Sequence, residues 1–263
     1  MPEKSLNPAN QTTFPRILGI IPARYASTRF PAKALADIAG KPMVQRVYER
    51  CIQAELLSRV IVATDHQQIA NTVFAFGGTA VLTNEHHPSG TDRCHEAFSL
   101  LGEEYDYIIN IQGDEPFIHP KQIDTLARLL ADKKPDIGTL VRVFSDEETL
   151  FSPNTVKVLL GTTGQAMAFS RQVIPYLRNV DKAFWLQSHT YFQHVGIYGY
   201  SAEALEAITL LPQSTLEKAE SLEQLRWLEN GFRIAAAVTE HESHGVDTPE
   251  DLERVVKLFE AHL

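Results

Sequence analysis

Positively charged side chains follow an apolar segment near the start of the chain. Residues 17–21 read Ile-Leu-Gly-Ile-Ile, which has the length and composition of a buried parallel strand, and a proline follows them. The next loop carries Arg24, Arg29 and Lys33, which repel one another unless an anion lies between them. Open α/β sheets bind ligands beyond the carboxyl ends of their strands, and arginine and lysine suit phosphate oxygens. The loop therefore predicts a polyphosphate site, and a solvated basic loop is the alternative.

A pair of acidic side chains follows a second apolar segment. Residues 107–111, Tyr-Ile-Ile-Asn-Ile, predict another central strand, and Gln112-Gly113-Asp114-Glu115-Pro116 comes directly after it. An acidic pair beside a polyphosphate is unfavourable unless a divalent cation lies between them. Magnesium prefers oxygen ligands and is usually held by one or two carboxylates together with substrate phosphates. Asp114 is therefore the best candidate metal ligand, and the alternative is a turn aspartate beside a solvated glutamate.

The elements that position these side chains alternate between strands and helices. Strands are predicted at residues 17–21, 59–64, 80–83, 107–111, 137–143, 155–160 and 194–200. Helices are predicted at 42–56 and 66–76 and from Pro120, with Pro42 and Pro120 at first helical positions. This alternation predicts an α/β fold with a mainly parallel central sheet and helices on both faces.

The later part of the chain departs from this alternation. Residues 161–200 contain glycines, a proline and an aromatic stretch, which predict a small lobe inserted in a single domain of residues 17–263. Residues 1–16 are polar and are expected to form a flexible tail. Ser214 opens a capping box that predicts one helix with leucines on its apolar face, and Thr248 is a credible N-cap for the last helix.

Composition narrows the classes of function. The 263 residues carry a formal charge of −9, which argues against a nucleic-acid surface, so an anionic substrate needs a local basic pocket. Cys51 and Cys94 are too few for a disulfide framework and favour reduced thiols in the cytoplasm. The chain has no apolar run long enough to span a bilayer, and its first residues lack the apolar core of a signal peptide.

Several motifs together carry a resemblance to a known family. They are Arg-Tyr-Ala-Ser-Thr-Arg at 24–29, Ser-Gly-Thr-Asp-Arg at 89–93, Gln-Gly-Asp-Glu-Pro at 112–116 and His-Val-Gly-Ile-Tyr-Gly-Tyr at 194–200. In this order they resemble the sugar nucleotidyltransferases that activate 3-deoxy-D-manno-octulosonate (Kdo) as CMP-Kdo. The family usually has Gly before the first-loop lysine and Pro after it, whereas this chain has Ala32 and Ala34.

The resemblance implies a role for each site residue. The residues implied to bind the nucleotide are Ala23, Arg24, Ser27, Arg29, Lys33, Ser89, Thr91 and Gln112. Sugar binding falls to Arg93, His194, Gly196, Tyr198, Glu223 and Gln224. Metal binding falls to Asp114 and Asp247, and catalysis to Arg24, Lys33 and Asp114. Without the resemblance, His194 would be a structural residue, Glu223 and Gln224 a solvated helix face, and His86 and His87 exposed loop residues.

The implied reaction condenses CTP with Kdo to give CMP-Kdo and pyrophosphate, with Mg²⁺ as cofactor, for lipopolysaccharide synthesis. The implied fold is a Rossmann-like nucleotidyltransferase domain, and the family is typically homodimeric. Two alternatives stay open: a cytidylyltransferase for another acidic sugar, of the amino-Kdo or sialic acid type, and a metal-dependent glycosyltransferase. A non-catalytic nucleotide-binding protein is a third, which the intact set of Arg24, Lys33, Asp114 and Asp247 disfavours.

Overall fold

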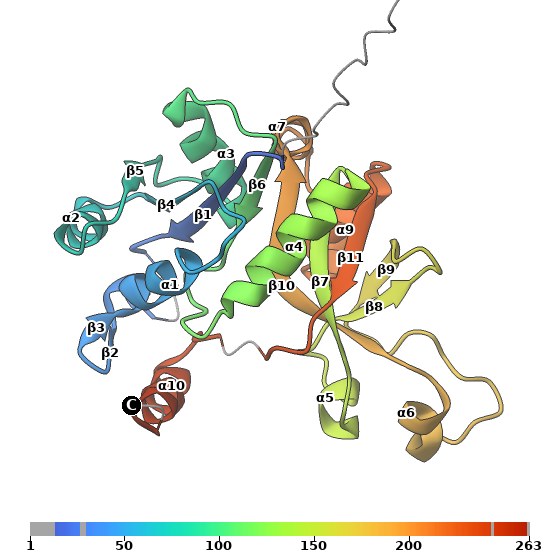
Figure 1. Ribbon diagram of the computed structural model, residues 1–263. Coiled ribbons are helices and arrows are strands. Elements are labelled where there is room, and N and C mark those ends of the chain that lie inside the picture. The colour runs from blue at the N-terminus through green and yellow to red at the C-terminus, as the bar shows by residue number, and fades with distance from the viewer. Residues whose placement is uncertain (1–13, 27–29, 243–244, 262–263) are drawn as a thin grey trace, which may run out of the picture.

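A mixed β-sheet forms the centre of the protein (Figure 1). The computed structural model describes residues 14–26, 30–242 and 245–261. In this part of the chain the sheet runs in the order β11-β7-β10-β6-β1-β4-β5, and β8 and β9 extend it beside β10. The strands are β1 (Ile17–Ala23), β4 (Arg59–Thr64), β5 (Ala80–Leu82), β6 (Tyr107–Asn110), β7 (Ile137–Val143), β8 (Lys157–Leu160), β9 (Ala166–Ser170), β10 (Phe192–Ser201) and β11 (Ile234–Val238).

The sheet combines a parallel half with an antiparallel insertion. Strands β6, β1, β4 and β5 pair in parallel, as do β7 and β11. Strand β10 lies antiparallel between β6 and β7, and its register with β7 shifts between Val195 and Tyr198. Gly196 therefore lies within a bulge, a local irregularity that redirects nearby side chains. The mainly parallel α/β sheet predicted from the sequence is confirmed, with β10 as its antiparallel member.

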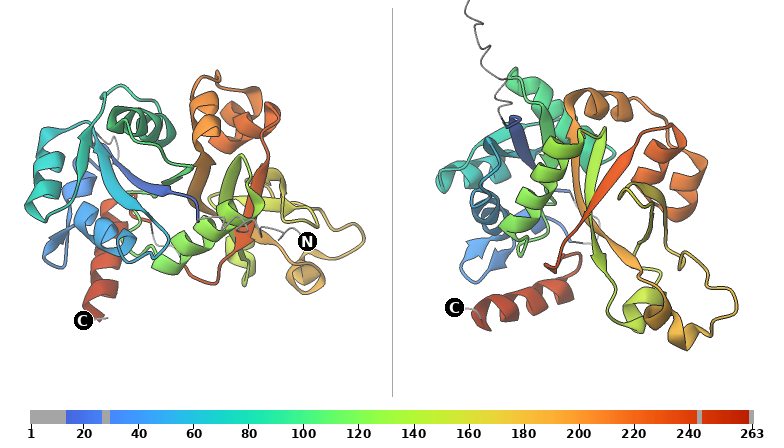
Figure 2. Two further views of the ribbon diagram at one scale, coloured as in Figure 1. Left: turned by 45° about the horizontal axis from the view of Figure 1, so that its top comes forward. Right: turned by 45° about the vertical axis from the view of Figure 1, so that its right-hand side comes forward.

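Helices cover both faces of the sheet (Figure 2). Along β1, Ile17 and Ile21 face the core under α1, α2 and α4, whereas Leu18 and Ile20 face the core under α3, α7 and α9. Side chains of a strand alternate between its two faces, so a strand buried on both sides is continuously apolar. The helices are α1 (Met43–Cys51), α2 (Gln67–Ala75), α3 (Gly90–Leu101), α4 (Pro120–Lys133), α7 (Ala202–Thr209), α8 (Thr215–Glu220), α9 (Glu223–Glu229) and α10 (Pro249–Ala261).

Two smaller cores lie beside the main ones. Phe144, Leu150, Trp185 and Tyr191 form one of them around the short helices α5 (Glu147–Phe151) and α6 (Trp185–Ser188). The other joins α10 to the hairpin of β2 (Asp37–Ile38) and β3 (Lys41–Pro42) through buried side chains. None of the helices in the described ranges has the length and apolar character needed to cross a membrane.

Three local predictions were wrong, and a fourth is not tested. Pro42 belongs to β3 and is the N-cap of α1, so this helix is shorter than the predicted 42–56. The helix predicted from Ser214 is two helices, because Ser221 adopts a left-handed conformation (φ 52°) that ends α8. The predicted lobe at 161–200 does not extend through β10, which pairs inside the central sheet. The predicted tail at 1–16 lies, for residues 1–13, outside the described part.

Candidate active site

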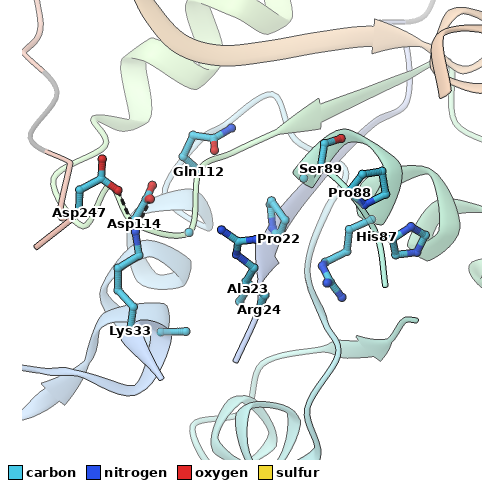
Figure 3. A pocket seen from close by; sticks show the side chains of 14 residues that line it. Pro22, Ala23, Arg24, Lys33, His87, Pro88, Ser89, Gln112, Asp114 and Asp247 are labelled. Carbon is cyan, nitrogen blue, oxygen red and sulfur yellow. Dashed lines mark hydrogen bonds and ion pairs between the residues drawn. The ribbon is translucent and has the colours of Figure 1, made fainter. Parts of the chain in front are cut away.

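A polar pocket opens at the carboxyl ends of β1 and β6 (Figure 3). Its volume is about 280 Å³. It is lined by Pro22, Ala23, Arg24, Lys33, Ala34, His87, Pro88, Ser89, Gly90, Arg93, Gln112, Gly113, Asp114 and Asp247. This is the edge at which open α/β sheets bind their ligands. The pocket thus joins the basic loop, the loop before α3 and the acidic loop after β6, as the motifs predicted.

Gly113 brings the two central loops into direct contact. A Cβ built on this glycine would lie 2.5 Å from the carbonyl oxygen of Pro22, which is closer than such atoms approach. Only glycine permits this separation, because every other residue carries a Cβ. The close approach holds Asp114 beside the end of β1, where the cationic side chains begin.

Lys33 lies between the two carboxylates that the sequence assigned to a metal (Figure 3). Its Nζ donates to Asp114 Oδ2 at 2.7 Å, to the carbonyl oxygen of Val246 at 2.8 Å and to Asp247 Oδ1 at 3.4 Å. The backbone N–H of Val246 donates to the carbonyl oxygen of Asp114 at 2.9 Å. Segments far apart in the sequence are thereby fixed around one ammonium group.

The backbone before Lys33 adopts an unusual conformation. Ala32 is the N-cap of the 3₁₀ turn at Lys33–Leu35 and has φ 55° and ψ 25°, in the left-handed region. Glycine adopts this region freely, but a residue with a Cβ pays about 1–2 kcal/mol for it. The backbone N–H of Ala32 also donates to the carbonyl oxygen of Tyr25 at 2.9 Å, which closes the loop. Alanine in place of the family's usual glycine is therefore accommodated under strain.

The start of α3 is tied to the start of α9 by hydroxyl groups. Thr91 Oγ1 donates to Glu223 Oε2 at 2.9 Å, and Ser89 Oγ lies 3.0 Å from Glu223 Oε1 and 2.6 Å from Asp92 Oδ2. Burial raises the pKa of Glu223, although the hydrogen bonds from Thr91 and Ser89 oppose this shift. Ser89 is also the N-cap of α3, accepting a hydrogen bond from the backbone N–H of Asp92.

Arg93 forms part of the wall of the pocket. Its guanidinium is almost completely buried and donates to Thr83 Oγ1 at 2.6 Å, to the carbonyl oxygen of Asn84 at 3.1 Å and to Asp65 Oδ2 at 3.2 Å. Asp65 in turn accepts a hydrogen bond from the backbone N–H of Tyr25 at 2.9 Å. Arg93 therefore connects α3 to the basic loop through a shared carboxylate.

The remaining sugar-binding candidates lie outside the residues that line this pocket. His194 Nε2 lies 3.1 Å from Thr139 Oγ1, and burial lowers the pKa of the imidazole to about 4, so the ring is neutral. Tyr198 packs between His194 and Trp227, and its buried hydroxyl has no hydrogen-bond partner among the described residues. Gln224 is buried at the start of α9, next to Glu223. Gln224 and Trp227 belong to α9, which also carries the Glu223 that Ser89 and Thr91 bind.

Comparison with known proteins decides the family. A family model described as cytidylyltransferase matches residues 18–234. A 3-deoxy-manno-octulosonate cytidylyltransferase of Parabacteroides distasonis is 56% identical over 245 residues, which cover 92% of this chain and 97% of the relative. The chain belongs to the 3-deoxy-manno-octulosonate cytidylyltransferase family. A second relative of the same name, from Cytophaga hutchinsonii, is 55% identical over 242 residues, covering 91% of this chain and 96% of the relative.

Solved structures agree with membership in this family. A CMP:2-keto-3-deoxy-manno-octonic acid synthetase complexed with CTP superposes with a TM-score of 0.86 at 42% identity, covering 94% of this chain and all of that one. A 4-diphosphocytidyl-2C-methyl-D-erythritol synthase from Anaerococcus prevotii, at 10% identity and a TM-score of 0.60, covers 94% of this chain and all of its own and shares the fold. The predicted family, α/β fold and nucleotidyltransferase class are confirmed.

The structure places most of the family's expected nucleotide residues around one cavity. Ala23, Arg24, Lys33, Ser89 and Gln112 line it, whereas Thr91 does not line it and binds the same Glu223 carboxylate as Ser89. The predicted contacts of Ser27 and Arg29 fall outside the described residues. Predicted roles for these side chains stay predictions, because their positions alone do not show what they bind.

Sequence reasoning missed two features of the pocket. His87 lines it, and its ring is paired with the carboxylate of Glu96 on α3, whereas the sequence suggested an exposed loop histidine. The spacing of nine residues between the two carries no motif, so no pattern pointed to the pair. The contact of Lys33 with both aspartates was also missed, because Lys33 was assigned to the phosphates and the two aspartates to a metal ion.

The donors in the pocket fit a divalent cation only in part. Among the described residues, no group of three or more His, Cys, Asp or Glu side chains has the geometry of a metal site. Asp114 and Asp247 nevertheless converge on one cationic group. Two carboxylates completed by substrate phosphates are a donor set that suits magnesium.

Proposed function

We propose that the protein transfers CMP from CTP to the anomeric hydroxyl of Kdo, giving CMP-Kdo and pyrophosphate for lipopolysaccharide synthesis. The observation that carries this proposal is the convergence of Lys33, Asp114 and Asp247 in a pocket that Arg24 also lines. A relative of 42% identity whose solved structure holds CTP, and relatives named as Kdo cytidylyltransferases, support the choice of substrates.

The chemistry needs no covalent enzyme intermediate. The anomeric oxygen of Kdo forms a bond to the α-phosphorus of CTP, the bond from that phosphorus to the bridging oxygen breaks, and pyrophosphate leaves as the hydroxyl loses its proton. Catalysis then depends on alignment and on neutralising the charge of the phosphates. Arg24 and Lys33 are the side chains in the pocket suited to bind the phosphates and the leaving pyrophosphate.

The other pocket residues divide between the two substrates. Ala23, Ser89, Thr91 and Gln112 would contact the nucleotide, together with Ser27 and Arg29 of the basic loop. Arg93, His194, Gly196, Tyr198, Glu223 and Gln224 would form the sugar site. The hydrogen bonds from Ser89 and Thr91 to Glu223 support a shared boundary between the two sites.

Asp114 and Asp247 would hold Mg²⁺. The ion supplies charge neutralisation at the phosphates and a more electrophilic phosphorus when it is bound. Both carboxylates already lie within ion-pair distance of a single group, the ammonium of Lys33, which supports their binding one metal ion together. Treatment with EDTA is expected to stop turnover, and added Mg²⁺ to restore it.

Pyrophosphate release from CTP tests the proposal, measured with and without Kdo and Mg²⁺. Release that requires all three supports it. Asp114→Asn is expected to abolish Mg²⁺-dependent turnover while the circular dichroism spectrum stays unchanged. Asp132→Asn, at an exposed position of α4, is the matched control and should retain activity. An active Asp114→Asn variant would remove this residue from the metal site.

The same assay separates the alternatives. Release with an amino-substituted Kdo or a sialic acid, but not with Kdo, would keep the mechanism and change the sugar. Hydrolysis or transfer from a nucleotide sugar without any reaction of CTP would favour a glycosyltransferase. Homodimer formation and a cytoplasmic location stay predictions, which light scattering on the purified protein and cell fractionation check.

A further inference from the structure

The ammonium group of Lys33 has used all its hydrogen-bond donors. A lysine ammonium carries three N–H donors. Three oxygens surround Nζ: Asp114 Oδ2 at 2.7 Å, the carbonyl oxygen of Val246 at 2.8 Å and Asp247 Oδ1 at 3.4 Å. The side chain is only 17% exposed. Lys33 can therefore bind a phosphate only by giving up at least one of these contacts.

Asp114 and Asp247, in turn, cannot readily bind a divalent cation while Lys33 contacts them. A divalent cation on the oxygens that Lys33 contacts would lie beside the ammonium, and like charges at such distances repel strongly where solvent is partly excluded. The roles proposed for Lys33 and for the aspartates thus exclude one another while the side chain stays where it is. If Nζ moves away from the carboxylates, Lys33 can bind a phosphate and the aspartates can bind the cation.

The backbone around Lys33 allows that movement without a loop rearrangement. Ala32 and Ala36 anchor the 3₁₀ turn through backbone hydrogen bonds to Tyr25 and to the carbonyl oxygen of Lys33. Ala34 is buried against the core. Nζ is joined to this turn through four methylene groups, a flexible stem that can change rotamer without moving the backbone.

We propose that Lys33 is a mobile counter-cation, which the phosphates of the nucleotide draw away from Asp114 and Asp247 so that these carboxylates can hold a divalent cation. The inference rests on the proposed function, since it requires a nucleotide triphosphate in this pocket. It makes the binding of nucleotide and metal mutually favourable, because coupling between two ligands is reciprocal. It also keeps one positive charge beside the two carboxylates until the substrate arrives.

The test measures Mn²⁺ binding without nucleotide, by electron paramagnetic resonance of the free ion. The wild-type protein should bind Mn²⁺ weakly. Lys33→Met removes the ammonium and should tighten binding at least tenfold, which corresponds to about 1.4 kcal/mol. Lys33→Arg keeps the charge and should bind as weakly as wild type. The double variant Lys33→Met with Asp114→Asn should lose the gain, which places the ion on this carboxylate.

A second measurement distinguishes this role from a merely structural one. In EDTA, Lys33→Met should bind CTP at least tenfold more weakly than wild type by calorimetry, because the phosphates have lost a cation. Mn²⁺ affinity and CTP affinity thus change in opposite directions, whereas a distorted pocket would weaken both. Lys41→Met is the matched control, since Lys41 pairs with Glu49 and not with the pocket, and should change neither affinity. Should Lys33→Met fail to fold, Lys33→Gln keeps a hydrogen-bond donor without the charge.

Two results would overturn the proposal: Mn²⁺ affinity that does not rise in the uncharged variants, or CTP affinity that does not fall in them. Both measurements are independent of turnover. If wild type releases pyrophosphate but the Mn²⁺ affinity of Lys33→Met is unchanged, only the counter-cation is refuted. If wild type does not release pyrophosphate from CTP with any acidic sugar, the proposed function fails instead.

Discussion

Gly113→Ala is expected to impair catalysis far more than it impairs folding. The added Cβ would lie 2.5 Å from the Pro22 carbonyl oxygen, and reaching the ordinary contact distance of 3.4 Å requires a displacement of about 0.9 Å. The obstacle is backbone on a buried central strand, so the loop that carries Asp114 has to move instead. A misplacement of about 1 Å at a reacting centre costs on the order of 100-fold in rate, or about 2.7 kcal/mol.

Pyrophosphate release measures this loss as a fall in kcat/KM of about 100-fold, and urea unfolding should show a loss of only about 1–3 kcal/mol, as for other overpacked positions. Gly161→Ala is the control, because the nearest neighbour of its added Cβ would lie at 3.6 Å and Gly161 is not one of the pocket residues. It should retain wild-type kcat/KM. A folded Gly113→Ala protein with wild-type kcat/KM would show that the contact between the two loops does not position Asp114.

Three further substitutions have outcomes fixed by local geometry. Ala32→Gly should raise the free energy of unfolding by about 0.5–1 kcal/mol in urea, because relief of left-handed strain exceeds the entropy that glycine adds to the unfolded chain. Thr91→Val should lower it by about 1–3 kcal/mol, because the half-buried Glu223 carboxylate loses a donor. For His194 the pKa is about 4 in the folded protein against 6.5 normally, so the unfolded chain takes up the proton first as pH falls. Wild-type stability should therefore decrease from about pH 6.5 down to about pH 4, and His194→Gln should flatten this dependence in pH-resolved thermal melts.

Each of these has a matched control and a contradicting result. Ala36→Gly, at φ −59°, should be destabilising, and an equally destabilising Ala32→Gly would show that no strain is stored at residue 32. Thr72→Val on α2, where the hydroxyl donates only to the carbonyl oxygen of Gln68, should be nearly neutral. If Thr91→Val were equally neutral, the hydrogen bond from Thr91 to Glu223 would not contribute to stability. An unchanged pH dependence in His194→Gln, compared with the exposed His189→Gln, would assign the titration to other groups.

The regular elements followed from the sequence because their patterns are local. The strands at 59–64 and 137–143 match the predicted residues, since continuous apolar runs between turn residues have few other stable arrangements. The errors occurred where tertiary context outweighs propensity. Ser221 gives no local signal of its left-handed conformation, and Pro42 suits a helix start and the edge of a hairpin equally well.

The site could be predicted as a set of residues but not as an arrangement. Motifs placed Lys33 and Asp114 in one pocket, because both follow central parallel strands. That Lys33 contacts both aspartates depends on how a long flexible side chain resolves competition among several oxygens. The pairing of His87 with Glu96 likewise depends on the course of the loop before α3, which no periodicity encodes.

The last described segment completes the pocket. Val246 and Val255 pack on Ile38 and Met43, and this packing brings Asp247 to Lys33. Because a ribosome delivers the chain from its amino end, the basic loop and most strands of the sheet emerge long before α10, and β11 emerges shortly before it. A nascent chain can therefore assemble most of the fold while it lacks one of the carboxylates. Docking of α10 is then a maturation step, and activity should appear only after this helix has left the ribosome.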